Sequence, residues 1–279
     1  KTGMNFPAAR SYALGRLLKN THCSHILNLP NNILAIEYLK QLKRTHSSMT
    51  PYAIKRQGSG YLDVNREASL PSAMAIRTML SEGLLPVDMA HCMPPAAVSV
   101  LRDVHGTYGP VYCDDFDVML HYQLVTGQEQ GFADYVDCSQ ELSNKICNHL
   151  SDYRSFTTFA ESLWSQDITT ARIYRCLTHI LLGLRREGLE TLQETGWIHY
   201  ARILGIGNQP QTSELTATLK AKTQIPLLTK PSKAEKLLSP VGNASLQKDL
   251  LANNIYRIAL SQKTKKTVPD VTRRPFLKL

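Results

Sequence analysis

The chain has 279 residues, of which 43% are hydrophobic, and a formal net charge of +9. This apolar content supports a sizeable core and excludes global disorder, and no apolar run approaches the roughly 20 residues that a membrane span needs. The six cysteines include no C-x-x-C pair. That pattern is typical of reduced cytoplasmic thiols and disfavours both a disulfide framework and a zinc site.

Residues 1–90 predict an alternation of helices and strands. Helices are expected over residues 1–19, after Asn31, and from about Ser72 to Gly83, with short strands over residues 25–29 and 52–55. The helix after Asn31 has a wide apolar face, which indicates packing on a sheet. The alternation is typical of an α/β domain.

Residues 91–279 predict a second region that is mainly α-helical. Helices are expected from Pro94 and over residues 115–124, 139–150, 156–163 and 169–186. A small α/β unit is expected after Gly188, with a buried strand within residues 223–230 and helices over 213–222 and 246–261. The sequence from residue 263 is basic and interrupted by proline, so we expect it to be loosely ordered. The predicted domains are therefore residues 1–90 and 91–279.

The basic charge is concentrated near the C-terminus. Residues 220–279 contain thirteen Lys and Arg against three Asp and Glu, whereas residues 1–219 contain nineteen against twenty. Residues 101–160 are acidic, with nine Asp and Glu against three Lys and Arg. A local basic excess favours a polyanion such as RNA. A solvated basic tail is the alternative.

Residues 28–77 contain the groups expected to form a nucleotide pocket. A helix start, here near Asn31 and Asn32, presents unpaired N–H groups and the positive end of the helix dipole, which favour phosphate. Lys55 and Arg56 would add positive charge at the end of a predicted strand, and two glycines that follow allow a close approach of the backbone. The alternatives are that the asparagines cap the helix and that the cations lie on the surface.

The sequence gives little support to a metal site, a P-loop, a dinucleotide-binding site or a serine hydrolase site. His22, Cys23 and His25 are close in sequence, but the spacing is short and no fourth ligand is evident, so we predict no metal site. The sequence has no Walker A, G-x-G-x-x-G or G-x-S-x-G motif. P-loop, dinucleotide-binding and serine hydrolase sites are therefore disfavoured.

Three segments of residues 28–77 carry a resemblance to a known family. PNNILAIEYLK, IKRQGSGYLD and SAMAIR resemble the bacterial tRNA(Met) cytidine acetate ligases, which are nucleotidyltransferase-like enzymes. Weaker similarity continues in family order through RIYRCLTHILLGL, YARILGIG, IPLLTK and DLLANNIY. The resemblance therefore spans nearly the whole chain, and this order is more specific than any single motif.

The resemblance implies an ATP site on these segments. It makes Asn31 the first candidate for an ATP contact and Asn32 the second, and it favours Arg56 over Lys55. Ser72 and Arg77 are weaker phosphate candidates. They lie in a segment that resembles the helix start with which nucleotidyltransferases hold the triphosphate. The family commonly has Thr at the position of Met74, so one hydroxyl donor is missing here.

The resemblance also implies a fold, a reaction and partners. The expected fold is α/β, a partial nucleotidyltransferase (Rossmann-like) domain followed by a mainly α-helical C-terminal region with a small α/β unit. In the implied reaction, acetate and ATP form acetyl-adenylate, and the N4 amine of the wobble cytidine of elongator tRNA-Met then takes the acetyl group. Mg²⁺ is expected with ATP. Neither a membrane nor DNA is an expected partner.

One family motif does not occur in this sequence. Family members hold the ATP phosphates with a His-x-Gly-His motif, which we expect to precede Lys1. The chain would then be the C-terminal two thirds of the enzyme, with its catalytic groups elsewhere and little activity alone. Two alternatives remain: another nucleotidyltransferase that acts on a small molecule, and a non-catalytic RNA-binding module.

Overall fold

The computed structural model describes residues 6–18, 29–55, 57–58, 70–105, 107–207, 211–270 and 277–278. The chain divides into two compact units, Lys1–Asp103 and Val104–Leu279. This division lies later than the boundary predicted near residue 90, because Leu101 packs against the buried cluster of the first unit. No helix in the described part of the chain is long and apolar enough to cross a membrane.

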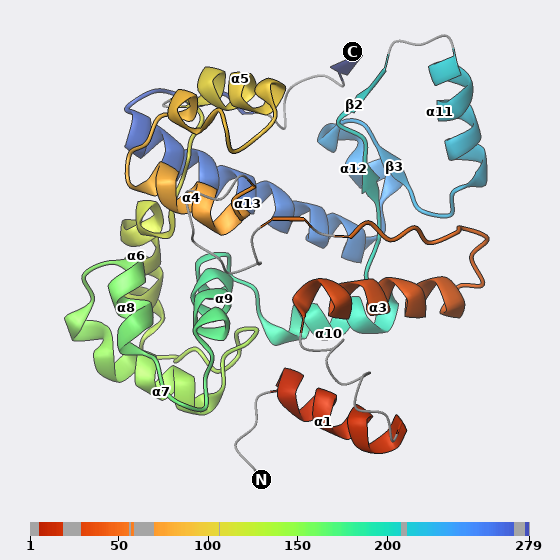
Figure 1. Ribbon diagram of the computed structural model, residues 1–279. Helices are drawn as coiled ribbons and strands as arrows, with labels where there is room; N and C mark the ends of the chain where they lie inside the picture. Colours follow the sequence, from red (N-terminus) through yellow and green to blue (C-terminus); the bar gives the residue numbers. More distant parts are fainter. Residues whose placement is uncertain are drawn as a thin grey trace. The chain divides into compact units, whose positions relative to one another are not determined.

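The first unit is helical in its described residues (Figure 1). Its helices are α1 (Phe6–Leu18), α3 (Pro30–Arg44), α4 (Ala73–Ser81), the short 3₁₀ helix η1 (Pro86–Met89) and α5 (Pro95–Val104). Met79, Met89 and Cys92 form its buried cluster. An ion pair of 3.0 Å between Arg10 and Glu37 joins α1 to α3. The helices predicted after Asn31 and from Ser72 to Gly83 are confirmed.

The strand predicted at residues 52–55 is wrong. These residues form no regular secondary structure, and Tyr52 and Ile54 are 91% and 86% exposed. The apolar face of α3 also contacts no sheet, since Leu34, Tyr38 and Leu39 are exposed. Both predictions needed a neighbouring strand, and the described residues of this unit contain none. The strand predicted at residues 25–29 falls almost wholly outside the described residues.

The second unit begins with a helical bundle in which α6, α8 and α9 lie side by side (Figure 1). The bundle consists of η2 (Cys113–Phe116), α6 (Asp117–Gly127), α7 (Gln140–His149), η3 (Leu150–Asp152), α8 (Phe156–Ser162) and α9 (Thr170–Leu181). Side chains of Ser139, Ser155 and Thr169 cap the N-termini of α7, α8 and α9. The large buried cluster of the unit lies among these helices.

The helix predicted over residues 169–186 ends earlier than expected, and a second helix begins at the end of the predicted range. The first, α9, ends at Leu181, and Gly183 takes a φ of +64°. A positive φ is adopted readily by glycine and stops helical continuation. The second, α10 (Arg186–Thr195), begins after four intervening residues.

The predicted small α/β unit is present after α10. Two short parallel pairs join β1 (Ala201–Arg202) to β3 (Leu227–Leu228) and β2 (Gly205–Ile206) to β4 (Leu277–Lys278). The helices are α11 (Gln211–Lys222), η4 (Pro231–Lys233), α12 (Ala234–Leu237) and α13 (Pro240–Thr264). The last begins six residues earlier than predicted, because the hydroxyl of Ser239 accepts a hydrogen bond from Gly242 N.

The C-terminal tail contacts α13 at Val268 and Asp270, so the prediction of a loose tail is wrong at these residues. Val268 is buried, and its carbonyl accepts a hydrogen bond of 2.8 Å from Arg257 Nη2. The Val268 N–H donates to Ser261 Oγ at 3.3 Å. Arg257 also lies 3.9 Å from the carboxylate of Asp270. One cation of the basic region therefore holds the tail against α13.

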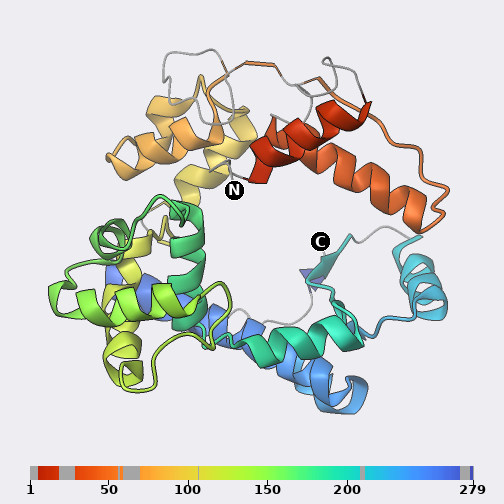
Figure 2. The ribbon, with the colours of Figure 1, turned by 90° about the horizontal axis from the view of Figure 1, so that it is seen from below.

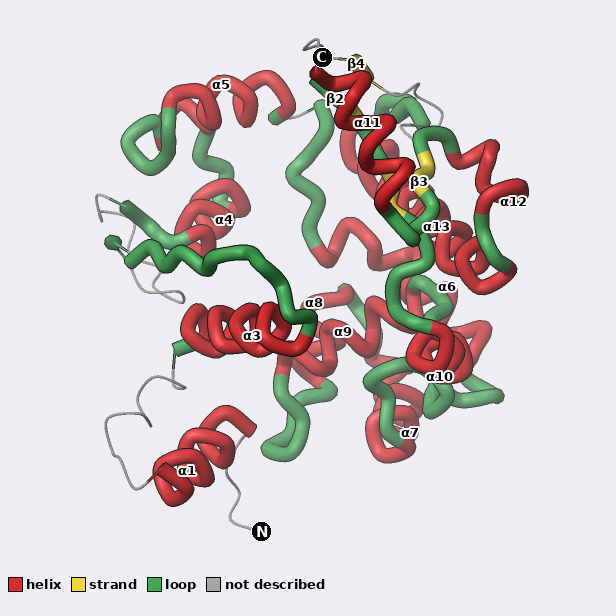
Figure 3. The backbone as a smooth tube through the Cα atoms, turned by 90° about the vertical axis from the view of Figure 1, so that its right-hand side faces the viewer, coloured by secondary structure: helices red, strands yellow, loops and turns green. Residues whose placement is uncertain are grey.

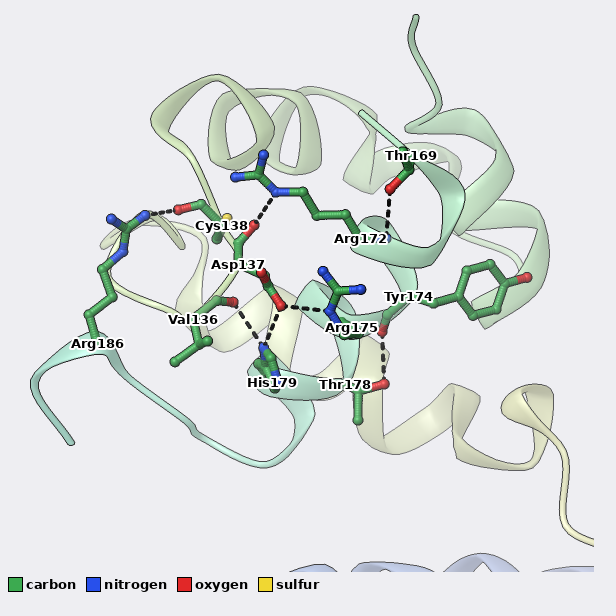
Figure 4. A network of polar contacts seen from close by, with 10 residues as sticks. All are labelled: Val136, Asp137, Cys138, Thr169, Arg172, Tyr174, Arg175, Thr178, His179 and Arg186. Carbon is green, nitrogen blue, oxygen red and sulfur yellow. Dashed lines mark hydrogen bonds and ion pairs between the residues drawn. The ribbon is translucent and has the colours of Figure 1, made fainter. Parts of the chain in front are cut away.

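A polar network fixes the loop before α7 against α9 (Figure 4). Asp137, at a positive φ of 64°, accepts a hydrogen bond of 2.9 Å from Arg175 Nε through its carboxylate and one of 3.1 Å from Arg172 Nε through its carbonyl. His179 Nδ1 lies 3.1 Å from the carbonyl oxygen of Val136 and 3.6 Å from the Asp137 carboxylate. The hydrogen bond from Arg175 is the main cause that lowers the pKa of Asp137.

The substitution Asp137→Asn is expected to remove a pH-dependent contribution to stability. Because the folded-state pKa of Asp137 is lowered, the carboxylate stabilises the fold above the unfolded value of about 3.9. This contribution to stability disappears as the pH falls through the folded-state pKa of Asp137. Urea unfolding at pH 7 should show a loss of about 1 kcal/mol, and at pH 3 a smaller loss. The same loss at both pH values would contradict this, and the exposed Asp167→Asn is the control.

Candidate nucleotide site

The asparagines predicted to contact ATP lie in the first turn of α3. The residue that caps this helix is Leu29, which has extended dihedral angles and makes no side-chain capping bond. Asn31 and Asn32 follow as the second and third helical residues, one exposed and one half-buried. The alternative in which an asparagine caps the helix is therefore wrong. No side chain caps the start of α3, but Pro30 has no N–H, and the N–H groups of Asn32 and Ile33 donate to the Leu29 carbonyl. The helix dipole and the Asn31 N–H are therefore what this helix start offers a ligand.

The segment after α3 brings Lys55 back toward the start of that helix. Figures 1 and 3 both show residues 45–55 running back along α3, opposite to its direction. Lys55, at the end of this segment, is exposed. No carboxylate among the described residues is found in an ion pair with Lys55. Arg56, the preferred ATP contact, lies outside the described residues.

A close contact ties the end of this segment to the start of α4. Gly58 has a φ of +80°, and a Cβ placed there would lie 2.6 Å from Leu70 Cβ and 2.7 Å from Leu70 O. Only glycine fits this position without moving the backbone of residue 70. Leu70 stands two residues before Ser72. The contact therefore brings the chain after Lys55 to the N-terminus of α4.

The weaker phosphate candidates have different surroundings. Ser72 is the N-cap of α4 and is 1% exposed, and its hydroxyl accepts a hydrogen bond of 3.1 Å from Ala75 N. Met74, at the position where the resemblance implies a threonine, is 38% exposed. Arg77, one turn into α4, is exposed. The hydroxyl of Ser72 already serves as a helix cap, so peptide N–H groups are the better phosphate donors at this helix start.

Charge near α3 is partly compensated. Glu37 accepts hydrogen bonds from Lys40 at 2.9 Å and from Arg10 at 3.0 Å. The bond from Lys40, followed by the bond from Arg10, lowers the pKa of Glu37. These two cations are used within the unit. The groups of this unit suited to hold an anion include two helix starts and exposed cations such as Lys55 and Arg77.

Comparison with known proteins identifies the fold. Crystal structures of Thermotoga maritima TmcAL, apo and bound with alpha-thio ATP, superpose with TM-scores of 0.84 and 0.82. Each covers 99% of this chain, at 22% and 23% identity, and the chain covers 68% and 67% of those structures. The fold is therefore nucleotidyltransferase-like, rich in helix with small parallel strand pairs, which confirms the predicted fold class.

The sequence comparison assigns the family. The model described as HIGH Nucleotidyl Transferase matches residues 1–270, and the chain belongs to this family. A relative from Thermoanaerobacter sp. (strain X514), named tRNA(Met) cytidine acetate ligase, is 32% identical over 93% of this chain. A relative of the same name from Acetivibrio thermocellus is 31% identical over 91% of it. The chain spans 62% of the length of these relatives.

The substitution Gly58→Ala is expected to weaken ATP binding. The substitution places a residue with a side chain at a positive φ and brings its Cβ against Leu70, which costs about 1–3 kcal/mol. If the full cost is lost from binding, the dissociation constant rises about five- to 150-fold, which calorimetry on the protein as its gene encodes it can measure. Gly83→Ala is the control, since Gly83 has a φ of +93° with no atom within 4 Å of its Cβ position. Equal ATP affinity in the two variants would contradict a role for the Gly58 contact.

Proposed function

We propose that this chain is part of an enzyme that acetylates N4 of the wobble cytidine of elongator tRNA-Met, with ATP and acetate as co-substrates. The observation that carries the proposal is the extent of the similarity to proteins named tRNA(Met) cytidine acetate ligase. It reaches 28–32% identity across 91–99% of the chain. The similarity covers both compact units and is not confined to one motif.

The proposed reaction has two steps. An acetate oxygen attacks the α-phosphate of ATP, which gives acetyl-adenylate and releases pyrophosphate. The N4 amine of cytidine then attacks the acetyl carbonyl carbon, loses a proton and releases AMP. Neither step needs a covalent enzyme nucleophile, so positioning and charge neutralisation would supply most of the catalysis.

The first unit would bind ATP through the groups around α3 and α4. The Asn31 amide, with Asn32 beside it, would contact the nucleotide, and Arg56 with Lys55 would contact its phosphates. Peptide N–H groups at the start of α4 would add donors to the phosphates. Mg²⁺ would enter with ATP, since this ion is commonly held by substrate phosphates together with few protein ligands.

The second unit would contribute contacts to the RNA backbone. Lys230, Lys233 and Lys236, spaced by three residues through η4 and α12, are exposed. Two other cations of the basic region are used internally: Arg257 on the tail and Lys263 on Asp115 at 2.7 Å. The exposed lysines are therefore better candidates for phosphate contacts than the region as a whole.

A labelling experiment tests this function and separates it from two alternatives. The protein as its gene encodes it is incubated with an unmodified elongator tRNA-Met transcript, ATP and radiolabelled acetate. We expect ATP-dependent label in N4-acetylcytidine. Pyrophosphate release without RNA, and no label in RNA, would favour a nucleotidyltransferase that acts on a small molecule. Binding of tRNA without any use of ATP would favour a non-catalytic RNA-binding module.

A further inference from the structure

The second unit contains a large cavity that the proposed ATP site does not use. Its volume is about 780 Å³, and it lies between α10 and the N-terminal half of α13, which run near each other in Figures 1 and 2. This volume is in the range of cavities that hold small organic ligands. Aliphatic side chains of Leu184, Leu192 and Val241 form part of its wall.

An exposed aromatic side chain stands at the edge of this cavity. The chain turns at Gly196, where φ is +101°, and Trp197 and Ile198 follow with 61% and 67% of their surface exposed. Neighbouring large apolar residues exposed in this way indicate a binding surface. An indole face beside aliphatic walls is suited to a flat, aromatic ligand.

The polar groups of the cavity are suited to hydrogen bonding rather than to binding a bare phosphate. Two cations, Arg185 and Lys248, are matched by two carboxylates, Glu187 and Asp249. The hydroxyl of Tyr200 donates a hydrogen bond to the Asp249 carboxylate, which keeps further acceptor positions. Burial, followed by this bond to Asp249, raises the pKa of Tyr200, so the phenol stays protonated and remains a donor.

Lys248 provides a positive charge at the same cavity. Its ammonium donates to the carbonyl oxygen of Gly183 at 2.8 Å. No ion pair between Lys248 and a carboxylate is found in the described part of the chain. An ammonium held by one neutral oxygen keeps two N–H donors, which suits a phosphate next to a bound base.

We propose that this cavity holds an unpaired, amino-bearing nucleobase of an RNA strand, cytosine or adenine. The base would stack on Trp197, its exocyclic amine would donate to Asp249, and Lys248 would contact the adjacent phosphate. The inference rests on the proposed function, from which RNA follows as the substrate class. It adds to that function a location for one base and a preference among bases.

Fluorescence titration of the full chain tests the stacking contact. The chain has two tryptophans, so Trp164→Phe leaves Trp197 as the reporter. Hexacytidylate should quench this fluorescence to saturation and bind at least fivefold more tightly than hexauridylate, which lacks an exocyclic amine. Asp249→Asn should remove that preference while RNA is still bound. An unchanged preference in Asp249→Asn would overturn the role of the carboxylate.

Anisotropy of fluorescein-labelled hexacytidylate tests Trp197 directly. Trp197→Ala should weaken binding about five- to 150-fold, the range measured for loss of one base-stacking residue. Trp164→Ala is the matched control, since Trp164 is 56% exposed in the same unit and outside the cavity. If both variants bind alike, the cavity is not a base site although RNA binding stands. If the unmodified chain binds neither oligonucleotide nor tRNA, the RNA part of the proposed function fails too.

Discussion

The substitution Phe159→Ala is expected to lower the free energy of unfolding of the second unit by about 3–5 kcal/mol. Phe159 is 2% exposed and belongs to the large buried cluster of the helical bundle. Its ring centroid lies 5.0 Å from that of Tyr153. Truncation removes a buried ring and leaves a cavity that close-packed helices fill only in part.

Tryptophan fluorescence follows this loss in the relevant part of the molecule, because Trp164 and Trp197 both lie in the second unit. Urea unfolding of Tyr122→Ala, where the removed ring is 66% exposed, provides the control, with an expected change below about 0.5 kcal/mol. Phe159→Leu retains most of the apolar volume and should give an intermediate loss. A loss below 1 kcal/mol for Phe159→Ala would contradict the assignment of the core.

The substitution Arg56→Ala is expected to remove ATP binding from the range that calorimetry detects. The guanidinium of Arg56 is proposed to hold the ATP phosphates through paired hydrogen bonds. Hydrogen bonds to charged groups contribute about 1.5–3 kcal/mol each, so their loss weakens binding by one to several orders of magnitude.

Two further variants serve as comparisons in this measurement of ATP binding, which uses the protein as its gene encodes it. Arg56→Lys keeps the charge but not the planar fork, and it should bind ATP with intermediate affinity. Arg154→Ala removes an exposed arginine from the second unit and should leave ATP affinity unchanged. If Arg56→Ala binds ATP as tightly as Arg154→Ala does, Arg56 is not an ATP contact.

Helices were predictable from the sequence where local signals define both ends. For α4, Ser72 supplies the N-terminal cap, and Gly83, at a φ of +93°, follows the last turn. For α7, Ser139 caps the start in the same way. These signals act over three or four residues, so the sequence alone contains them.

Predictions that depended on distant partners were wrong. Residues 52–55 have the composition of a strand, but a strand needs a hydrogen-bonding neighbour, and none is described in this unit. The length of α9 was overestimated because the apolar pattern continues through Leu184 beyond the turn at Gly183. Burial of Val268 could not be anticipated from a basic, proline-containing tail, because it depends on Arg257 and Ser261 of another element.

The candidate ATP site was only partly predictable. The positions of Asn31 and Asn32 at a helix start follow from local sequence, but the identity of the cap, Leu29, does not. The contact joins Gly58 to Leu70, twelve positions later in the sequence, and has no local signal beyond the glycine. The cavity beside Trp197 combines three separate segments of the chain. The exposed aromatic residue was its one sequence signal, and it was missed.

The most direct test of the proposed function is the nucleoside composition of elongator tRNA-Met in cells with and without this gene. The tRNA is purified, digested to nucleosides and analysed by mass spectrometry. The account predicts that deletion removes N4-acetylcytidine, that the intact gene restores it, and that the Arg56→Ala gene does not. Unchanged N4-acetylcytidine in the deletion strain would contradict the account.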